Sequence, residues 1–179
     1  MDARLGQVFN GQAAIALERA YAAPNYAPIP VTLERGDGCG LWDADGKRYL
    51  DFMSAYSAVS HGHAHPRLVK ALIEQAQRVA VTSRAYHSTV LGPFLAKLVE
   101  LADLGSPARA LPASGGCESV ETAIKAARRW GYRVKGIPAG HAEIVVARGN
   151  FHGRSSTVVG FSTEPGYRAD FGPFAPGFR

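Results

Sequence analysis

Apolar and polar residues alternate along residues 31–52, and a period of two predicts β-strands with one buried face. Three short strands are expected, over residues 31–35, 39–43 and 47–52. The pair Asp45-Gly46 is a strong hairpin signal, so neighbouring strands should run antiparallel. A short helix is expected before them, over residues 12–21. The opening of the chain therefore predicts a small antiparallel β-meander.

Beyond residue 60 the apolar spacing changes to that of helices, with short apolar runs between them. Helices are expected over residues 66–80, 91–101 and 117–132. Strands are expected over residues 108–111 and 142–147, the second a continuous apolar run typical of a strand buried on both faces. The segment 152–160 begins like a helix, although its valines favour a strand, and residues 171–179 read as a Gly/Pro loop.

Alternating helices and strands of this kind indicate an α/β fold with a parallel sheet. We expect an N-terminal segment with the meander over residues 1–60, followed by the first part of a large α/β domain over residues 61–179. Two or three short parallel strands leave sheet edges exposed to solvent, which natural proteins avoid. The large domain is therefore expected to be incomplete within these residues.

The 179 residues are 46% hydrophobic and 20% charged, which fits an ordinary globular chain. The net charge of +5 is scattered along the sequence, so it argues against a nucleic-acid surface and favours a small anionic ligand. Two cysteines make no disulfide framework and indicate a reducing cytoplasm. The first seven residues lack a signal-peptide pattern, and no apolar run is long enough to span a membrane.

A small-residue turn, Ser114-Gly115-Gly116-Cys117, leads into the expected helix at 117–132. Glycines allow close approach of a phosphate, and the first N–H groups of a helix favour an anion. The alternative is a plain turn without a ligand. Some thirty residues later, Phe151 could stack on a flat cofactor and Arg154 could hold a carboxylate, although each taken alone also suits a core ring and a surface charge.

Two further clusters have weaker chemical interpretations. His61, His63 and His65 have the alternate spacing that could bring three metal ligands to one side of an extended segment, but no fourth ligand is signalled, and a polar loop is favoured. Cys117 at a helix start could be an activated thiolate if the fold brings His87 or His152 near it.

Several segments together resemble the class III, pyridoxal-phosphate-dependent aminotransferases, with the ornithine branch of that family as the best match. The resemblance runs from about Tyr26 to the last residue. The segments that carry it include 149–154 (Gly-Asn-Phe-His-Gly-Arg) and Glu118 with Glu121-Thr122-Ala123, and the Phe-His-Gly-Arg part of the first is shared by the whole family. Segments more specific to the ornithine branch are Tyr56-Ser57-Ala58-Val59 and Trp130-Gly131-Tyr132.

The resemblance implies the start of a fold-type I transferase that uses pyridoxal 5'-phosphate. It places the phosphate against the backbone of Gly116 and Cys117, next to Gly115. Gly115 stands where the family usually has a hydroxyl residue, which removes one phosphate hydrogen bond. It places Phe151 against the pyridine ring. Tyr26, Tyr56 and Arg154 match residues that line the substrate pocket, Arg154 as the arginine that holds a carboxylate.

The implied reaction moves an amino group from L-ornithine to a 2-oxoacid, as part of arginine and proline metabolism. The family's Schiff-base lysine and the aspartate paired with the pyridine nitrogen match no residue here, so we expect no catalytic residue in these 179 residues and no activity from them alone. Family members are dimers, so a homodimer or a complementing C-terminal half is expected. Alternatives are another class III enzyme, of acetylornithine or 4-aminobutyrate type, and a non-catalytic relic or interaction partner.

Overall fold

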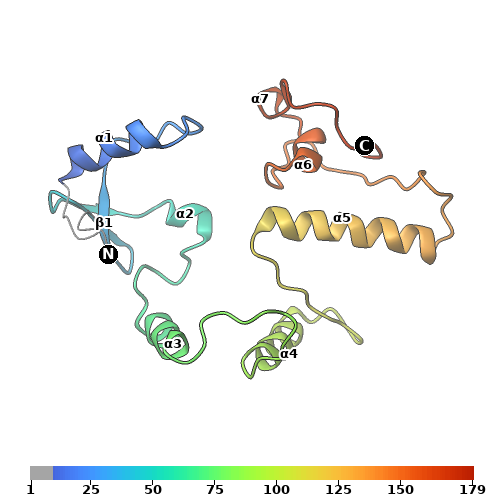
Figure 1. The fold of residues 1–179 in the computed structure, drawn as a ribbon, viewed down its shortest axis with the longest axis horizontal. Coiled ribbons are helices and arrows are strands. Elements are labelled where there is room, and N and C mark those ends of the chain that lie inside the picture. Colours follow the sequence, from blue (N-terminus) through green and yellow to red (C-terminus); the bar gives the residue numbers. More distant parts are fainter. Residues whose placement is uncertain (1–9) are drawn as a thin grey trace. The chain divides into compact units, whose positions relative to one another are not determined.

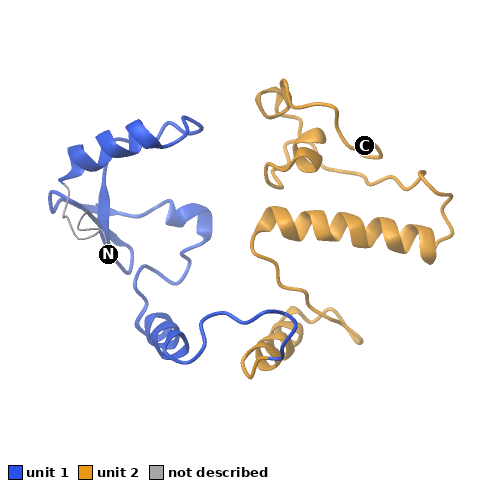
Figure 2. Ribbon diagram, in the orientation of Figure 1, with its two compact units in different colours: residues 1–87 blue, residues 88–179 orange. Residues whose placement is uncertain are grey.

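The computed structural model describes residues 10–179, and the first nine residues, which include those that predict no signal peptide, lie outside this description. The chain forms two compact units that divide between His87 and Ser88 (Figure 2). This division concerns contacts within these residues and does not test the domain boundary expected near residue 60, which stays a prediction.

The first unit opens with α1 (Gly11–Tyr21), which confirms the predicted helix (Figure 1). The helix begins there because Asn10 has extended backbone and its side chain accepts a hydrogen bond from the N–H of Ala13, at 2.9 Å. A side-chain oxygen at this position satisfies one of the amides that the first helical turn leaves without an intrahelical partner.

A three-stranded antiparallel sheet follows, in the order β1 (Leu33–Asp37), β2 (Gly40–Asp43) and β3 (Arg48–Leu50). This is the predicted meander, with β1 displaced by two residues along the chain, β2 one residue shorter and β3 three residues shorter than expected. The Trp42 ring lies below the guanidinium of Arg35, 3.6 Å from its Cζ atom, and also near Arg48. These cation–π contacts join side chains of all three strands across one face of the sheet.

Two helical segments complete the first unit. The four residues of α2 (Ser54–Ser57), which no sequence pattern predicted, have left-handed backbone, with φ between 46° and 70°. The predicted helix at 66–80 is confirmed as α3 (Pro66–Ala76), which ends four residues early. Pro66 suits the first helical position because the N–H it lacks has no intrahelical partner there.

The second unit contains α4 (Leu91–Ala102), α5 (Gly116–Arg133), α6 (Ser156–Gly160) and α7 (Pro165–Arg168). The predicted helices at 91–101 and 117–132 are confirmed within one residue at each end. The ambiguous segment 152–160 is helical in its second half and not a strand, because Ser155 caps the helix by accepting from the N–H of Val158.

The core of the second unit lies between α5, α6 and the C-terminal loop. Ile124, Val158 and Phe161 are buried together, and they are joined by partly buried Cys117, Val120, Ile144, Val146 and Phe178. The rings of Phe161 and Phe178 lie 4.6 Å apart. This cluster fixes the start of α5 relative to the segment that leads into α6.

The two predicted strands of the second unit are wrong as regular strands. Residues 108–111 have no strand structure, and 142–147 makes a single parallel bridge, between Ile144 and Phe178. Val145, expected to be buried on both faces, is 84% exposed. A strand is stabilised by the hydrogen bonds of a neighbouring strand, and within the described residues 88–179 the backbone of Ile144 and Val146 is hydrogen-bonded only to the C-terminal tail.

Candidate functional site

The start of α5 has the geometry of an anion-binding turn. Gly115 precedes the helix with extended backbone, and the first intrahelical bond runs from the N–H of Ser119 to the carbonyl of Gly115. The N–H groups of Gly116 and Cys117 therefore precede the helical ladder and are available to a ligand. A Cβ placed on Gly115 or Gly116 would meet no atom within 4 Å, so the space beside this backbone is open.

A carboxylate already lies at this helix start. Glu118 accepts a hydrogen bond from the N–H of Ser114 at 2.7 Å, which holds the turn in place. The contact resembles a capping box, in which an acidic residue in the first turn reaches back to the residues before the helix. The Glu118 carboxylate is therefore engaged in a hydrogen bond with the backbone of Ser114.

The segment 149–155 is pinned to the start of α5 by close backbone packing. A Cβ on Gly153 would lie 2.5 Å from the Cβ and 2.6 Å from the Sγ of Cys117, a separation that only glycine permits. Gly153 also has a φ of 118°, which other residues rarely adopt. The two segments that sequence reasoning combined into one site are therefore brought together in the structure.

The hydroxyl of Ser155 reinforces this junction. Its Oγ atom is hydrogen-bonded to Oε1 of Glu121 on α5, and it also lies beside the thiol of Cys117. Hydrogen bonds from the Ser155 side chain, the Ser155 backbone and the Arg154 backbone lower the pKa of the Cys117 thiol below its usual value. His152 is not among the groups that shift this pKa, and His87 belongs to the other unit, so its pairing with Cys117 stays a prediction. Sequence reasoning missed Ser155, whose only signal was its N-cap position before a short apolar helix.

Phe151 and Arg154 share a neighbour, Tyr167 of α7. The Phe151 ring meets the Tyr167 ring edge-on at 6.0 Å, and the Arg154 guanidinium carbon lies 5.6 Å from the same ring. Phe151 remains 61% exposed, so its ring is accessible to a flat ligand. Tyr167, which the sequence did not signal, is in ring contact with both side chains.

Tyr26 and Tyr56 lie in the first unit. Tyr26 is on the proline-rich segment after α1 and lines a groove of about 590 Å³ formed by α1 and residues 22–33. Tyr56 is on the left-handed turn α2 and is 87% exposed. Their roles as substrate-pocket residues stay predictions.

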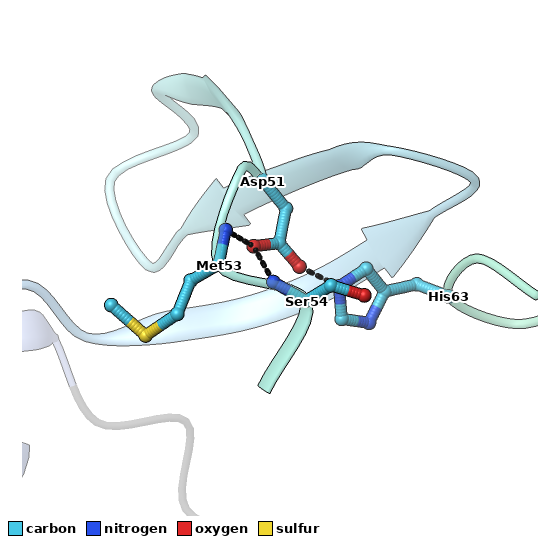
Figure 3. Close-up of polar contacts among 4 residues, drawn as sticks. All are labelled: Asp51, Met53, Ser54 and His63. Carbon is cyan, nitrogen blue, oxygen red and sulfur yellow. Dashed lines mark hydrogen bonds and ion pairs between the residues drawn. The ribbon is translucent and has the colours of Figure 1, made fainter. Parts of the chain in front are cut away.

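The three histidines at 61–65 do not act as one ligand set in the described part of the chain. Positive φ values at Gly62 and Ala64 break the extended geometry on which the metal interpretation depended. The Nε2 atom of His63 lies 2.7 Å from Oδ2 of Asp51 (Figure 3). The rings of His61 and His65 face each other edge-on instead, with their centroids 6.3 Å apart. Among the described residues no group of three or more potential ligands is placed to hold a metal ion.

No helix among residues 10–179 combines the length and the apolar character that crossing a membrane requires. The two cysteines, Cys39 and Cys117, are both free thiols. These observations leave the α5 turn with Phe151 and Arg154 as the best-defined candidate site.

Comparison with known proteins relates nearly the whole chain to one enzyme family. The family model of the class-III aminotransferases matches residues 21–179. The chain is 52% identical over 162 residues to the ornithine aminotransferase of Bordetella pertussis and 49% identical over 164 residues to the mitochondrial ornithine aminotransferase of Drosophila ananassae. The alignments cover 90% and 92% of this chain but only 39% and 37% of those relatives.

Solved structures are also similar. The ornithine aminotransferase of Toxoplasma gondii superposes with a TM-score of 0.92 at 38% identity, covering 98% of this chain and 41% of that one. The acetylornithine aminotransferase of Elizabethkingia anophelis superposes with a TM-score of 0.78 at 48% identity, covering 95% and 40%. The expected fold-type I architecture is therefore confirmed, with these residues spanning about two fifths of the related chains. The chain belongs to the class III aminotransferases.

Proposed function

We propose that this chain is the N-terminal part of an ornithine aminotransferase, which moves the δ-amino group of L-ornithine to 2-oxoglutarate and yields glutamate 5-semialdehyde and glutamate. The observation that carries the proposal is the close packing of Gly153 on Cys117, which joins the α5 turn to the segment bearing Phe151 and Arg154. It is supported by the roughly 50% identity to ornithine aminotransferases.

The residues present fit pyridoxal 5'-phosphate. Open space beside Gly115 and Gly116, together with the N–H groups of Gly116 and Cys117, suits its phosphate. The exposed ring of Phe151 suits its pyridine. When bound, the cofactor supplies the electron sink that amino-group transfer requires.

The substrate contacts follow from the remaining candidates. Arg154 offers the planar, two-pronged donor set that binds a carboxylate. Tyr26 and Tyr56 present hydroxyl groups that suit the carboxylate and the amino-acid backbone of ornithine. Each of these residues binds or orients the substrate, and none moves a proton in the reaction.

The isolated chain is proposed to be inactive and to need the remaining three fifths of the fold, from a second chain or from a longer form of this one. Large apolar side chains that are exposed within each unit support this, because a complete domain buries most of its large apolar side chains. Helices α3 and α4 expose large apolar side chains, among them Leu72, Phe94 and Leu101. The complete assembly is proposed to be a dimer, as in other family members.

Coexpression tests the proposal. The chain is produced together with the part of the Bordetella pertussis ornithine aminotransferase that follows the matched segment, and glutamate formation from ornithine and 2-oxoglutarate is measured. Activity of the mixture, with none from either part alone, is the expected result. A stable complex that is inactive on every amino donor would contradict it.

A second candidate, an acetylornithine aminotransferase, is favoured by the 48% identity to the Elizabethkingia anophelis structure. The same coexpressed complex separates the two functions when N-acetylornithine and ornithine are supplied at equal concentration. A preference for N-acetylornithine would replace the first proposal with the second.

A further inference from the structure

A strained turn carries Tyr56. Four consecutive residues without a glycine, Ser54 to Ser57, have φ values of 50°, 46°, 57° and 70°. Left-handed backbone is disfavoured for each of them because Cβ approaches the following carbonyl. Conformations of this kind persist only where the surrounding structure holds them, and they gather at functional sites.

The turn is not held by its own side chains. Tyr56 is 87% exposed, and Ala55 and Ser57 are also exposed. Its internal bonds are from the backbone, such as the N–H of Tyr56 to the carbonyl of Met53 and the N–H of Val59 to the carbonyl of Ser54. The place of the Tyr56 ring is therefore set by the backbone that enters and leaves α2.

Asp51 holds the entrance. Its Oδ1 atom accepts from the N–H groups of Met53, at 3.0 Å, and Ser54, at 2.8 Å (Figure 3). Its own N–H donates to the carbonyl of Cys39 beside the sheet. One carboxylate oxygen thus binds two consecutive amides at the point where the chain turns left-handed.

His63 holds the chain that follows α2 and connects it to Asp51, which precedes α2. Because a carboxylate only accepts, the His63 Nε2 atom donates to Oδ2 of Asp51 at 2.7 Å. The backbone of His63 pairs in both directions with Gly38. Its ring fills the space above Gly36 of β1, where a Cβ would come within 2.7 Å of it.

We propose that Asp51 and His63 form a positioning pair that closes the loop 51–63 on the sheet, holds α2 left-handed and thereby sets the place of Tyr56 for the amino donor. The part that concerns the donor rests on the proposed function. The part that concerns the turn depends only on this chain and is tested without any activity.

The first experiment measures one-bond Cα–Hα couplings, which report the sign of φ, at residues 54–57 of the isotope-labelled 179-residue chain. The variants are Asp51→Ala and His63→Ala, with His61→Ala as the matched control, since His61 is in the same loop but its ring contacts His65, whereas Asp51 is bonded by His63. His63→Gln keeps a side-chain N–H donor and serves as the conservative variant.

The expected result is loss of the positive-φ couplings in both disruptive variants, their retention in the control, and their partial return in His63→Gln. An unchanged Trp42 indole signal shows that the sheet is intact. Positive-φ couplings that persist in Asp51→Ala and His63→Ala would overturn the proposal.

If either variant also loses the Trp42 signal, a double variant that combines the same substitution with Ala55→Gly tests the proposal instead. Glycine adopts left-handed backbone without the steric cost, so it lessens the need for the pair. Recovery of the Trp42 signal and of the couplings at residues 54, 56 and 57 supports the proposal, and no recovery overturns it.

The second experiment uses the coexpressed complex. His63→Ala is expected to raise the KM for ornithine roughly ten-fold with a smaller effect on kcat, whereas His61→Ala leaves both unchanged. Loss of the couplings without a change in KM would overturn the role of Tyr56. A complex that rejects ornithine altogether would refute the proposed function, while the coupling result on the chain would still stand.

Discussion

Gly153 packs against Cys117 so closely that a Cβ on the glycine would lie 2.5 Å from the Cβ of the cysteine. This contact fixes the Phe151–Arg154 segment to the start of α5. Gly153→Ala should therefore destabilise the chain by about 2–4 kcal/mol, through overpacking and through strain at a φ of 118°. Urea unfolding followed by circular dichroism measures the change.

Gly149→Ala is the matched control for this substitution. Gly149 also has a positive φ, of 69°, but a Cβ there would meet nothing within 4 Å. It should cost only the strain of left-handed backbone, about 1–2 kcal/mol. Equal losses in the two variants would show that the contact with Cys117 contributes nothing.

The Cys117 thiol should ionise more readily than an ordinary thiol. Hydrogen bonds from Ser155 and from the Arg154 backbone lower its pKa, so the midpoint of its alkylation by iodoacetamide should lie below that of a free thiol. Ser155→Ala, in a Cys39→Ser background, should move the midpoint upward. Ser119→Ala is the control, because Ser119 bonds the carbonyl of Gly115, and a shift of equal size there would contradict the assignment to Ser155.

The meander should lose stability in acid. The Tyr49 hydroxyl donates to Asp43 at 2.6 Å and, with the backbone of Lys47, lowers the pKa of that carboxyl; His63 does the same for Asp51. A carboxyl with a lowered folded pKa stabilises the fold above its unfolded pKa of about 3.9, and this contribution is lost as the pH falls through the folded pKa. Urea midpoints between pH 7 and pH 3 measure the loss.

Asp43→Asn separates this contribution from general acid effects. Since asparagine does not titrate, the variant should be less stable than the native chain at pH 7 and should lose less on acidification. An acid loss identical to that of the native chain would exclude Asp43 as a source.

The elements that sequence reasoning predicted correctly are those with local causes. The pair Asp45-Gly46 sets the hairpin between β2 and β3, and apolar residues at helical spacing define α3 and α4. The strand expected at 142–147 fails for a non-local reason, because its apolar run needs neighbouring strands that residues 88–179 do not supply. Its exposed Val145 marks where such neighbours would pack.

The sequence predicts which segments form the site, but it does not predict how those segments contact one another. The glycine turn and the Phe151–Arg154 segment carry recognisable chemistry, yet their junction depends on Gly153 meeting Cys117 across 36 positions of sequence. The pair Asp51–His63 is likewise not apparent from the sequence pattern, because the chain between them contains a run of four left-handed residues, Ser54 to Ser57, without a glycine to signal it.

Two substitutions in the coexpressed complex should separate cofactor binding from substrate binding. Phe151→Leu removes the exposed ring and should weaken the binding of pyridoxal 5'-phosphate roughly two- to ten-fold, by fluorescence titration. Arg154→Lys keeps the charge but loses the two-pronged donor, so the KM for the substrate whose carboxylate it holds should rise roughly 10- to 100-fold while cofactor affinity is retained.

Phe171→Leu is the control for the ring, because Phe171 is similarly exposed, at 62%, but is not in ring contact with Phe151 or Tyr167. Phe171→Leu should change neither the affinity for pyridoxal 5'-phosphate nor the KM of either substrate. If Arg154→Lys weakened the cofactor and left both KM values unchanged, Arg154 would belong to the phosphate side of the site. The carboxylate would then need another partner, and Tyr26 on its groove beside α1 would be the next residue to replace.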